Sequence, residues 1–128
     1  MPKLNILVLD DEPIVGKRLK PALAKSGYGV DVVETGADAI RLIDERIYDI
    51  VVTDIRMEGV DGIAVLRHAL ARSARTLVIM ITGYATVEMA REALTLGAFD
   101  FLAKPFKLDD LRAVITRAAE KLAADRPS

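Results

Sequence analysis

Five apolar runs of strand length recur along this 128-residue chain, and segments with helical spacing separate them. In runs such as 6–9 and 78–81 every residue is apolar, which is typical of parallel strands covered by helices on both faces. Successive parallel strands require right-handed crossover helices. The pattern therefore predicts an α/β fold, a doubly wound five-stranded parallel sheet, with strands at 4–9, 30–33, 50–53, 77–81 and 99–103.

The intervening segments carry helix start and stop signals. Pro13 can occupy the first turn of a helix that stops near Gly27, and Thr35 can cap the next helix. The spacing of apolar residues predicts three further helices, at 60–70, from Thr86 to Gly97, and at 108–122.

One domain accounts for the whole sequence. We expect it to span residues 1–123, with 124–128 as a polar tail or the start of a linker to a further domain. We favour the linker, because the family that the sequence resembles, described below, is usually multidomain.

Charge and composition exclude several classes of protein. Lys and Arg number 18 against 19 Asp and Glu, so a net charge of −1 gives no general attraction to nucleic acid or anionic membranes. The chain has no Cys, no apolar run long enough to span a membrane, and no signal-peptide pattern. We expect a cytoplasmic protein.

Polar residues follow four of the predicted strands. In such sheets the functional site lies at the carboxyl ends of the strands. The residues at those ends are Asp10-Asp11-Glu12, Asp54, Thr82-Gly83 and Lys104-Pro105.

A cluster of these side chains favours a divalent cation. The carboxylates of Asp10, Asp11 and Asp54 together with the ammonium of Lys104 would carry a formal charge of −2. The metal-binding atoms available nearby are all oxygen atoms. Mg²⁺ is the expected ion, with Mn²⁺ as a substitute. The sole histidine, His68, lies away from the strand ends and receives no role.

The same set of side chains can form an aspartyl phosphate. A carboxylate at Asp54 can attack phosphorus, while Mg²⁺ and Lys104 neutralise phosphoryl oxygens and the Thr82 hydroxyl donates a hydrogen bond. A single Asp at a strand end is more often a turn former or a helix cap. The interpretation depends on the coincidence across four strand ends.

Four motifs in this order resemble the response-regulator receiver family over residues 4–122. They are Asp10-Asp11-Glu12; 52–57 with Asp61-Gly62; Ile81-Thr82-Gly83-Tyr84; and 101–106, Phe-Leu-Ala-Lys-Pro-Phe. The stretches 81–86 and 97–101 are most similar to receivers of nitrogen-regulation type. The resemblance implies the flavodoxin-like, chemotaxis-regulator-like receiver fold with strand order 2-1-3-4-5.

The resemblance also implies residue roles. Asp54 would be the phospho-acceptor, and the ligands of Mg²⁺ would be Asp10, Asp11, Asp54 and the backbone carbonyl of Arg56. Thr82 would be the switch hydroxyl and Lys104 the cation that binds the phosphoryl group. The side-chain rotamer of Phe101 would change with the position of Thr82. The Lys104–Pro105 peptide bond would be cis.

The implied partners are a sensor histidine kinase as phosphodonor and a covalent output domain that controls transcription. This domain would not bind nucleic acid or membrane itself and would not be an enzyme in the usual sense. It would pair with itself through the fourth helix, fifth strand and fifth helix, using charged residues that include Arg91, Glu92, Asp100, Arg112, Arg117 and Lys121.

Two residues depart from the family pattern. Glu58 stands where Pro is common, which places a charge near the metal site, and Phe101 stands where many members have Tyr. The side chains of Arg56 and Tyr84 would lie at the entrance through which water reaches the phosphoryl group on Asp54.

Two other functions fit the same architecture less well. A Mg²⁺-dependent phosphohydrolase generally has Asp-x-Asp after the first strand and a substrate cap, and Asp10-Asp11-Glu12 lacks that spacing. A flavin or nucleotide binder needs a phosphate loop rich in Ser, Thr and Gly at the same place, where these acids would repel phosphate.

Overall fold

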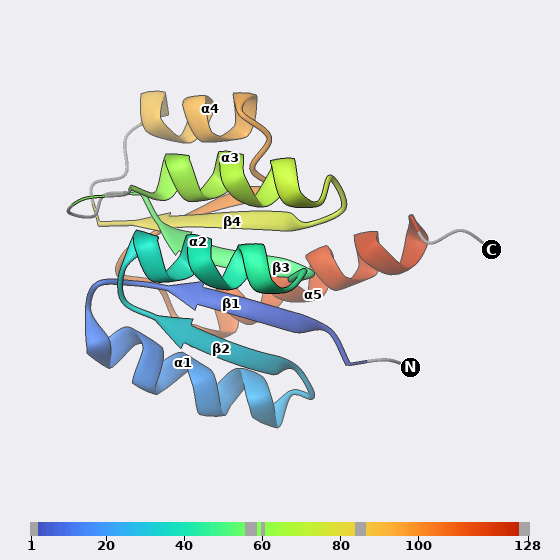
Figure 1. Cartoon of the computed structure of the whole chain (residues 1–128). Helices are drawn as coiled ribbons and strands as arrows, with labels where there is room; N and C mark the ends of the chain where they lie inside the picture. The colour runs from blue at the N-terminus through green and yellow to red at the C-terminus, as the bar shows by residue number, and fades with distance from the viewer. Residues whose placement is uncertain (1–2, 56–58, 60, 84–86, 126–128) are drawn as a thin grey trace.

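The computed structural model describes residues 3–55, 59, 61–83 and 87–125. Within these ranges the chain alternates strands and helices (Figure 1). The strands are β1 (Asn5–Leu9), β2 (Gly29–Val33), β3 (Ile50–Asp54), β4 (Leu77–Thr82) and β5 (Asp100–Ala103). The helices are α1 (Pro13–Lys25), α2 (Gly36–Glu45), α3 (Gly62–Arg72), α4 (Val87–Thr95) and α5 (Leu108–Ala124).

The strands form one parallel sheet in the order β2-β1-β3-β4-β5. This confirms the predicted fold class and strand order. Because all strands run in the same direction, their carboxyl ends meet along one edge, at the left of Figure 1.

Side chains alternate between two cores, one on each face of the sheet. Leu7, Leu9, Val51 and Met80 pack in the core under α2, α3 and α4. The core on the other face, under α1 and α5, includes the β-strand residues Ile6, Val8, Ile50, Val52, Ile79 and Ile81. Both faces of the central strands are thus buried, which explains their uninterrupted apolar sequence.

Capping residues set the helix starts more closely than apolar spacing does. Thr35 Oγ1 accepts a hydrogen bond from Asp38 N at 3.1 Å and caps α2, as predicted. The predicted start of the third helix, Val60, lies outside the described residues, and α3 begins at Gly62. The Asp61 side chain accepts from Ala64 N at 3.0 Å, so Asp61 is the N-cap and the helix follows it.

Gly62 brings the start of α3 against the end of β3. A Cβ atom on Gly62 would overlap the backbone carbonyl oxygen of Asp54 and would lie 2.8 Å from the Ile55 Cα. Gly62 N also donates to Ile55 O at 2.9 Å. The β3 end and α3 are therefore in direct backbone contact.

A side-chain contact of Tyr48 stabilises the sheet away from the carboxyl ends of its strands. Its side chain is buried, and its hydroxyl donates to Asp31 Oδ2 on the edge strand β2 at 2.6 Å. Arg46 Nη1 lies 3.4 Å from the same oxygen. Burial and the Asp31 carboxylate raise the pKa of the Tyr48 hydroxyl above its ordinary value.

The last helix ends one residue before the last described residue, Asp125. α5 continues through Ala124, so the expected boundary between residues 123 and 124 falls in its final turn. None of the described helices is long and apolar enough to cross a membrane.

Candidate functional site

The carboxyl ends of β1 and β3 bring two buried acids to one edge of the sheet. Asp10 follows β1 and is 1% exposed, and Asp54 ends β3 and is 6% exposed. Asp54 lies on the same face as Ile50 and Val52, which pack towards α1 and α5. Isolated buried carboxylates are costly, so their partners define the site.

Lys104 supplies the partner for both acids. Its ammonium Nζ lies 2.8 Å from Asp10 Oδ2 and 2.9 Å from Asp54 Oδ2. Lys104 follows β5, so the contact joins strands that are not neighbours in the sheet. The three residues that sequence reasoning placed at strand ends are thus brought together.

Glu12 is a further partner of Lys104. Its Oε1 lies 2.9 Å from the Lys104 Nζ, and its side chain is 60% exposed, in contrast to those of Asp10 and Asp54. Sequence reasoning noted Glu12 only as part of a motif. Its position after two acids at a strand end indicates that Glu12 lies near the site. The contact with Lys104, 92 residues away, could not be predicted from the spacing of residues in the sequence.

Burial and charge act in opposite directions on these groups. Burial raises the pKa of Asp10, although contacts with Lys104 and with the Glu12 backbone N–H, which donates to Oδ1 at 2.9 Å, oppose that rise. Burial lowers the pKa of Lys104, and the contacts with the carboxylates of Asp10, Glu12 and Asp54 outweigh it, so the net pKa is raised. Lys104 is therefore a fixed positive charge at neutral pH.

The acids at the end of β1 form an acidic cluster of the kind that binds a divalent cation. One carboxylate oxygen from each of Asp10, Asp11 and Glu12 lies within 4.8 Å of the others. Asp10 Oδ2 is buried without a hydrogen bond of good geometry, which leaves it able to coordinate. All these donors are carboxylate oxygens, so the set fits a hard cation.

Thr82 and Phe101 lie on the other face of the sheet, towards α3 and α4. Thr82 ends β4 and is fully buried, and its register partner on β5 is Ala103. Phe101 pairs with Met80 and packs, half-buried, against the same core as Met80. Since Met80 and Thr82 point the same way, the ring of Phe101 is a diagonal neighbour of Thr82.

Several expected residues fall outside the described residues, namely Arg56, Glu58, Tyr84 and the cap at Thr86. The Lys104–Pro105 peptide bond is described, and it is cis.

The charged residues that were predicted to form the self-association surface make different contacts within the chain. Arg117 Nη2 binds Asp100 Oδ2 within the chain at 2.7 Å, and Lys121 pairs with Asp125. Arg112 Nη2 donates to Ala22 O of α1 at 3.5 Å, so this arginine points towards α1. The placement of Arg112 on the surface of α4, β5 and α5 is therefore corrected, because its side chain lies on the opposite side of α5.

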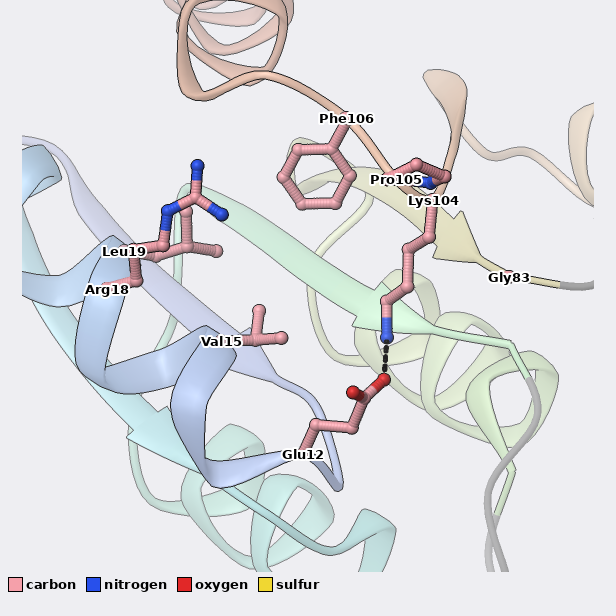
Figure 2. A pocket seen from close by; sticks show the side chains of 8 residues that line it. All are labelled: Glu12, Val15, Arg18, Leu19, Gly83, Lys104, Pro105 and Phe106. Carbon is pink, nitrogen blue, oxygen red and sulfur yellow. Dashed lines mark hydrogen bonds and ion pairs between the residues drawn. The ribbon is translucent and has the colours of Figure 1, made fainter.

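A cavity of about 580 Å³ adjoins the cluster between α1 and the segment after β5. Val15, Leu19 and Phe106 form its apolar wall, and Glu12 and Lys104 meet across it (Figure 2). Arg18 lines it as well. Lys104 thus belongs both to the buried acids and to an open hollow beside them.

Comparison with known proteins agrees with this geometry. The sequence profile of the response regulator receiver domain matches residues 6–116. The regulatory protein AtoC of Escherichia coli is 42% identical over 116 residues, which cover 91% of this chain and 25% of AtoC. The C4-dicarboxylate transport transcriptional regulatory protein DctD of Rhizobium meliloti is 34% identical over 117 residues, 91% of this chain and 25% of DctD.

Solved structures show the same fold. A CheY-like receiver domain from Methanospirillum hungatei superposes with a TM-score of 0.93 at 25% identity, covering 98% of this chain and 100% of that one. NtrX from Brucella abortus gives a TM-score of 0.89 at 32% identity, covering 98% of this chain and 29% of that one.

AtoC and DctD are much longer than the chain, which spans about a quarter of each. The matched region is nearly all of this chain, and it contains the sheet and the strand ends described above. The chain belongs to the response regulator receiver domain family, the receiver domains of two-component signalling.

Proposed function

We propose that Asp54 accepts a phosphoryl group with the help of Mg²⁺ and that the domain then changes conformation to control an output. The observation that carries this proposal is the bridge of Lys104 Nζ to Asp54 at 2.9 Å and Asp10 at 2.8 Å. It supports a site in which a nucleophilic carboxylate, a fixed cation and metal-binding oxygens share one point in space.

The proposed transfer needs few groups. An oxygen of Asp54 attacks phosphorus, the new O–P bond forms, and the bond from phosphorus to the donor breaks, with its electron pair leaving on the donor. The Lys104 ammonium binds one phosphoryl oxygen, and the Thr82 hydroxyl donates a hydrogen bond to another. No proton has to be removed from Asp54, because it reacts as the carboxylate.

Asp10 and Asp11 would hold Mg²⁺ together with Asp54 and the backbone carbonyl of Arg56. The ion, or Mn²⁺ in its place, would supply positive charge to the phosphoryl oxygens. The oxygen donors at the end of β1 support this assignment.

A sensor histidine kinase is the proposed donor, and transcription is the proposed output. Relatives named as transcriptional regulators, such as DctD, are about four times as long as the matched region, which supports a covalent output domain beyond this chain. Receiver domains of this kind are generally switches and not enzymes. We assign the domain to the cytoplasm, where such a kinase would act.

The conformational change would run through Thr82 and Phe101. If the Thr82 hydroxyl moves towards the phosphoryl group, the neighbouring Phe101 ring can turn into the space that it leaves. The surface made by α4, β5 and α5 would then change and pair with a second copy.

Intact-mass spectrometry tests the chemistry directly. With Mg²⁺ and acetyl phosphate, the protein should gain about 80 Da, one phosphoryl group on an aspartate. Asp54→Asn should gain nothing, and EDTA should block the gain in the unmodified protein. The same mass gain in Asp54→Asn would show that Asp54 is not the acceptor.

A further inference from the structure

Glu12 forms an ion pair with Lys104, whose ammonium is proposed to bind the phosphoryl group. Glu12 Oε1 lies 2.9 Å from the Lys104 Nζ, at the first residue before α1 (Figure 2). Asp10 and Asp54 hold the same nitrogen from inside the site, and both are buried. Lys104 therefore has two inner carboxylates and one outer carboxylate, which is open to solvent.

We infer that Glu12 is a positioning residue that competes with the phosphoryl group for Lys104 and so slows phosphorylation by small anionic donors. The inference rests on the function proposed above. An ammonium has three N–H donors; that of Lys104 donates to Glu12 and Asp54, and Asp10 Oδ2 lies 2.8 Å away in an ion pair. A phosphoryl oxygen would compete for this ammonium with the carboxylates that already contact it, and Glu12 is the exposed one.

Charge acts in the same direction as geometry. Asp10, Asp11, Glu12 and Asp54 carry four negative charges against the single positive charge of Lys104, a formal −3. A small phosphodonor is itself anionic, so each carboxylate at the entrance raises the energy of its approach. Glu12 both repels the donor and weakens the cation that would attract it.

The exposure of Glu12 gives it a part in choosing the donor. Its side chain faces solvent at the rim of the hollow between α1 and the segment after β5. A protein donor that places a cationic side chain against Glu12 would draw it away from Lys104 as it docks. Acetyl phosphate carries no such cation, so Glu12 favours the protein donor.

The first experiment compares initial rates of Asp54 phosphorylation by acetyl phosphate at Mg²⁺ concentrations raised to the plateau for each variant. Glu12→Gln should react about two to five times faster than the unmodified protein, the range that a partly exposed ion pair supplies. Glu34→Gln is the matched control, because Glu34 is an exposed acid at the carboxyl end of the neighbouring strand β2. It should leave the rate unchanged, and an equal gain in both variants would reduce Glu12 to general repulsion.

A double-variant comparison shows whether Glu12 acts through Lys104. In a Lys104→Met background, Glu12→Gln should no longer accelerate the reaction, since the ammonium that it competes for is gone. The same acceleration in both backgrounds would overturn the inference.

A metal-free readout separates contact from reactivity. With ¹⁵N-labelled lysine, the Lys104 ammonium signal, assigned by its loss in Lys104→Met, should shift in Glu12→Gln and stay in place in Glu34→Gln. An unmoved signal, or an unchanged rate in Glu12→Gln while the unmodified protein is phosphorylated on Asp54, overturns this inference alone. Failure of the unmodified protein to react would overturn the proposed function and this inference with it.

Discussion

Lys104 Nζ lies 2.9 Å from Asp54 Oδ2, although 50 residues separate the two in the chain. The pair spans β3 and β5 with the end of β4 between them in the sheet. Without a metal ion, this ammonium compensates the charge of the two buried acids, Asp10 and Asp54. The stability of the domain should therefore depend on Lys104 and Mg²⁺ together.

Lys104→Met should destabilise the metal-free protein by about 1 to 3 kcal/mol, because two buried carboxylates lose their shared partner. Mg²⁺ bound as proposed would supply positive charge to the same oxygens, so it should stabilise the variant more than it stabilises the unmodified protein. Urea unfolding in EDTA and in excess Mg²⁺ measures both effects. An identical Mg²⁺ effect on the two proteins would mean that ion and ammonium do not share their carboxylates.

Tyr48→Phe should cost about 1 to 2 kcal/mol near pH 8, because the buried hydroxyl donates to the Asp31 carboxylate. The pKa of Tyr48 is raised in the folded state, so the folded chain keeps this proton at a pH where the unfolded chain loses it. The contribution is thus complete below pH 10, roughly the unfolded value, and decreases as the pH rises beyond it.

The measurement is the difference in unfolding free energy between the unmodified protein and Tyr48→Phe from pH 8 to 11, in which other alkaline effects cancel. Tyr28→Phe serves as the control, since Tyr28 is a half-buried ring at the same end of the sheet. A constant difference across this range would contradict the raised pKa.

Association through α4, β5 and α5 should respond to Arg91 and not to Arg112. Arg91 is an exposed residue of α4, whereas Arg112 donates to Ala22 O of α1. With Mg²⁺ and beryllofluoride, a phosphoryl mimic, Arg91→Glu should weaken self-association in light scattering. Arg112→Ala should leave association unchanged and lower stability by about 1 kcal/mol. The reverse pattern would place the interface on the α1 side.

Gly62→Ala should destabilise the protein by about 1 to 3 kcal/mol, although alanine is ordinarily the better helix former. The added Cβ would overlap backbone atoms of Asp54, which no side-chain rotation can relieve. Gly83→Ala is the control, since among the described residues the nearest atom to its Cβ would be the Lys104 Cβ, at 4.0 Å. Equal unfolding midpoints for the two variants would contradict the close contact between β3 and α3.

The sequence predicted the sheet and its order because strands buried on both faces leave an unmistakable apolar pattern. It also placed Asp10, Asp54 and Lys104 at strand ends, since the carboxyl ends of parallel strands converge whatever the loop details. The N-cap of α3 was not predicted, because apolar spacing describes the face of a helix and not its cap at Asp61.

Two side-chain arrangements could not be read from the sequence. The contact between Glu12 and Lys104 depends on which rotamer a long, exposed side chain adopts. The direction of Arg112 depends on which neighbour lies beside that flank of α5, and the stripe of apolar residues in α5 does not distinguish the α1 side from the α4 side.

The backbone contact at Gly62 restricts movement of the end of β3 relative to α3. With no room for even one carbon atom between α3 and the Asp54 carbonyl, the strand that would receive the phosphoryl group is wedged against its own helix. A phosphoryl group on Asp54, as proposed, would therefore add its charge where the strand backbone is packed against the backbone of α3. Thr82 ends β4 and Lys104 follows β5, so the proposed response would run across the sheet through neighbouring strands and not down the strand that is modified.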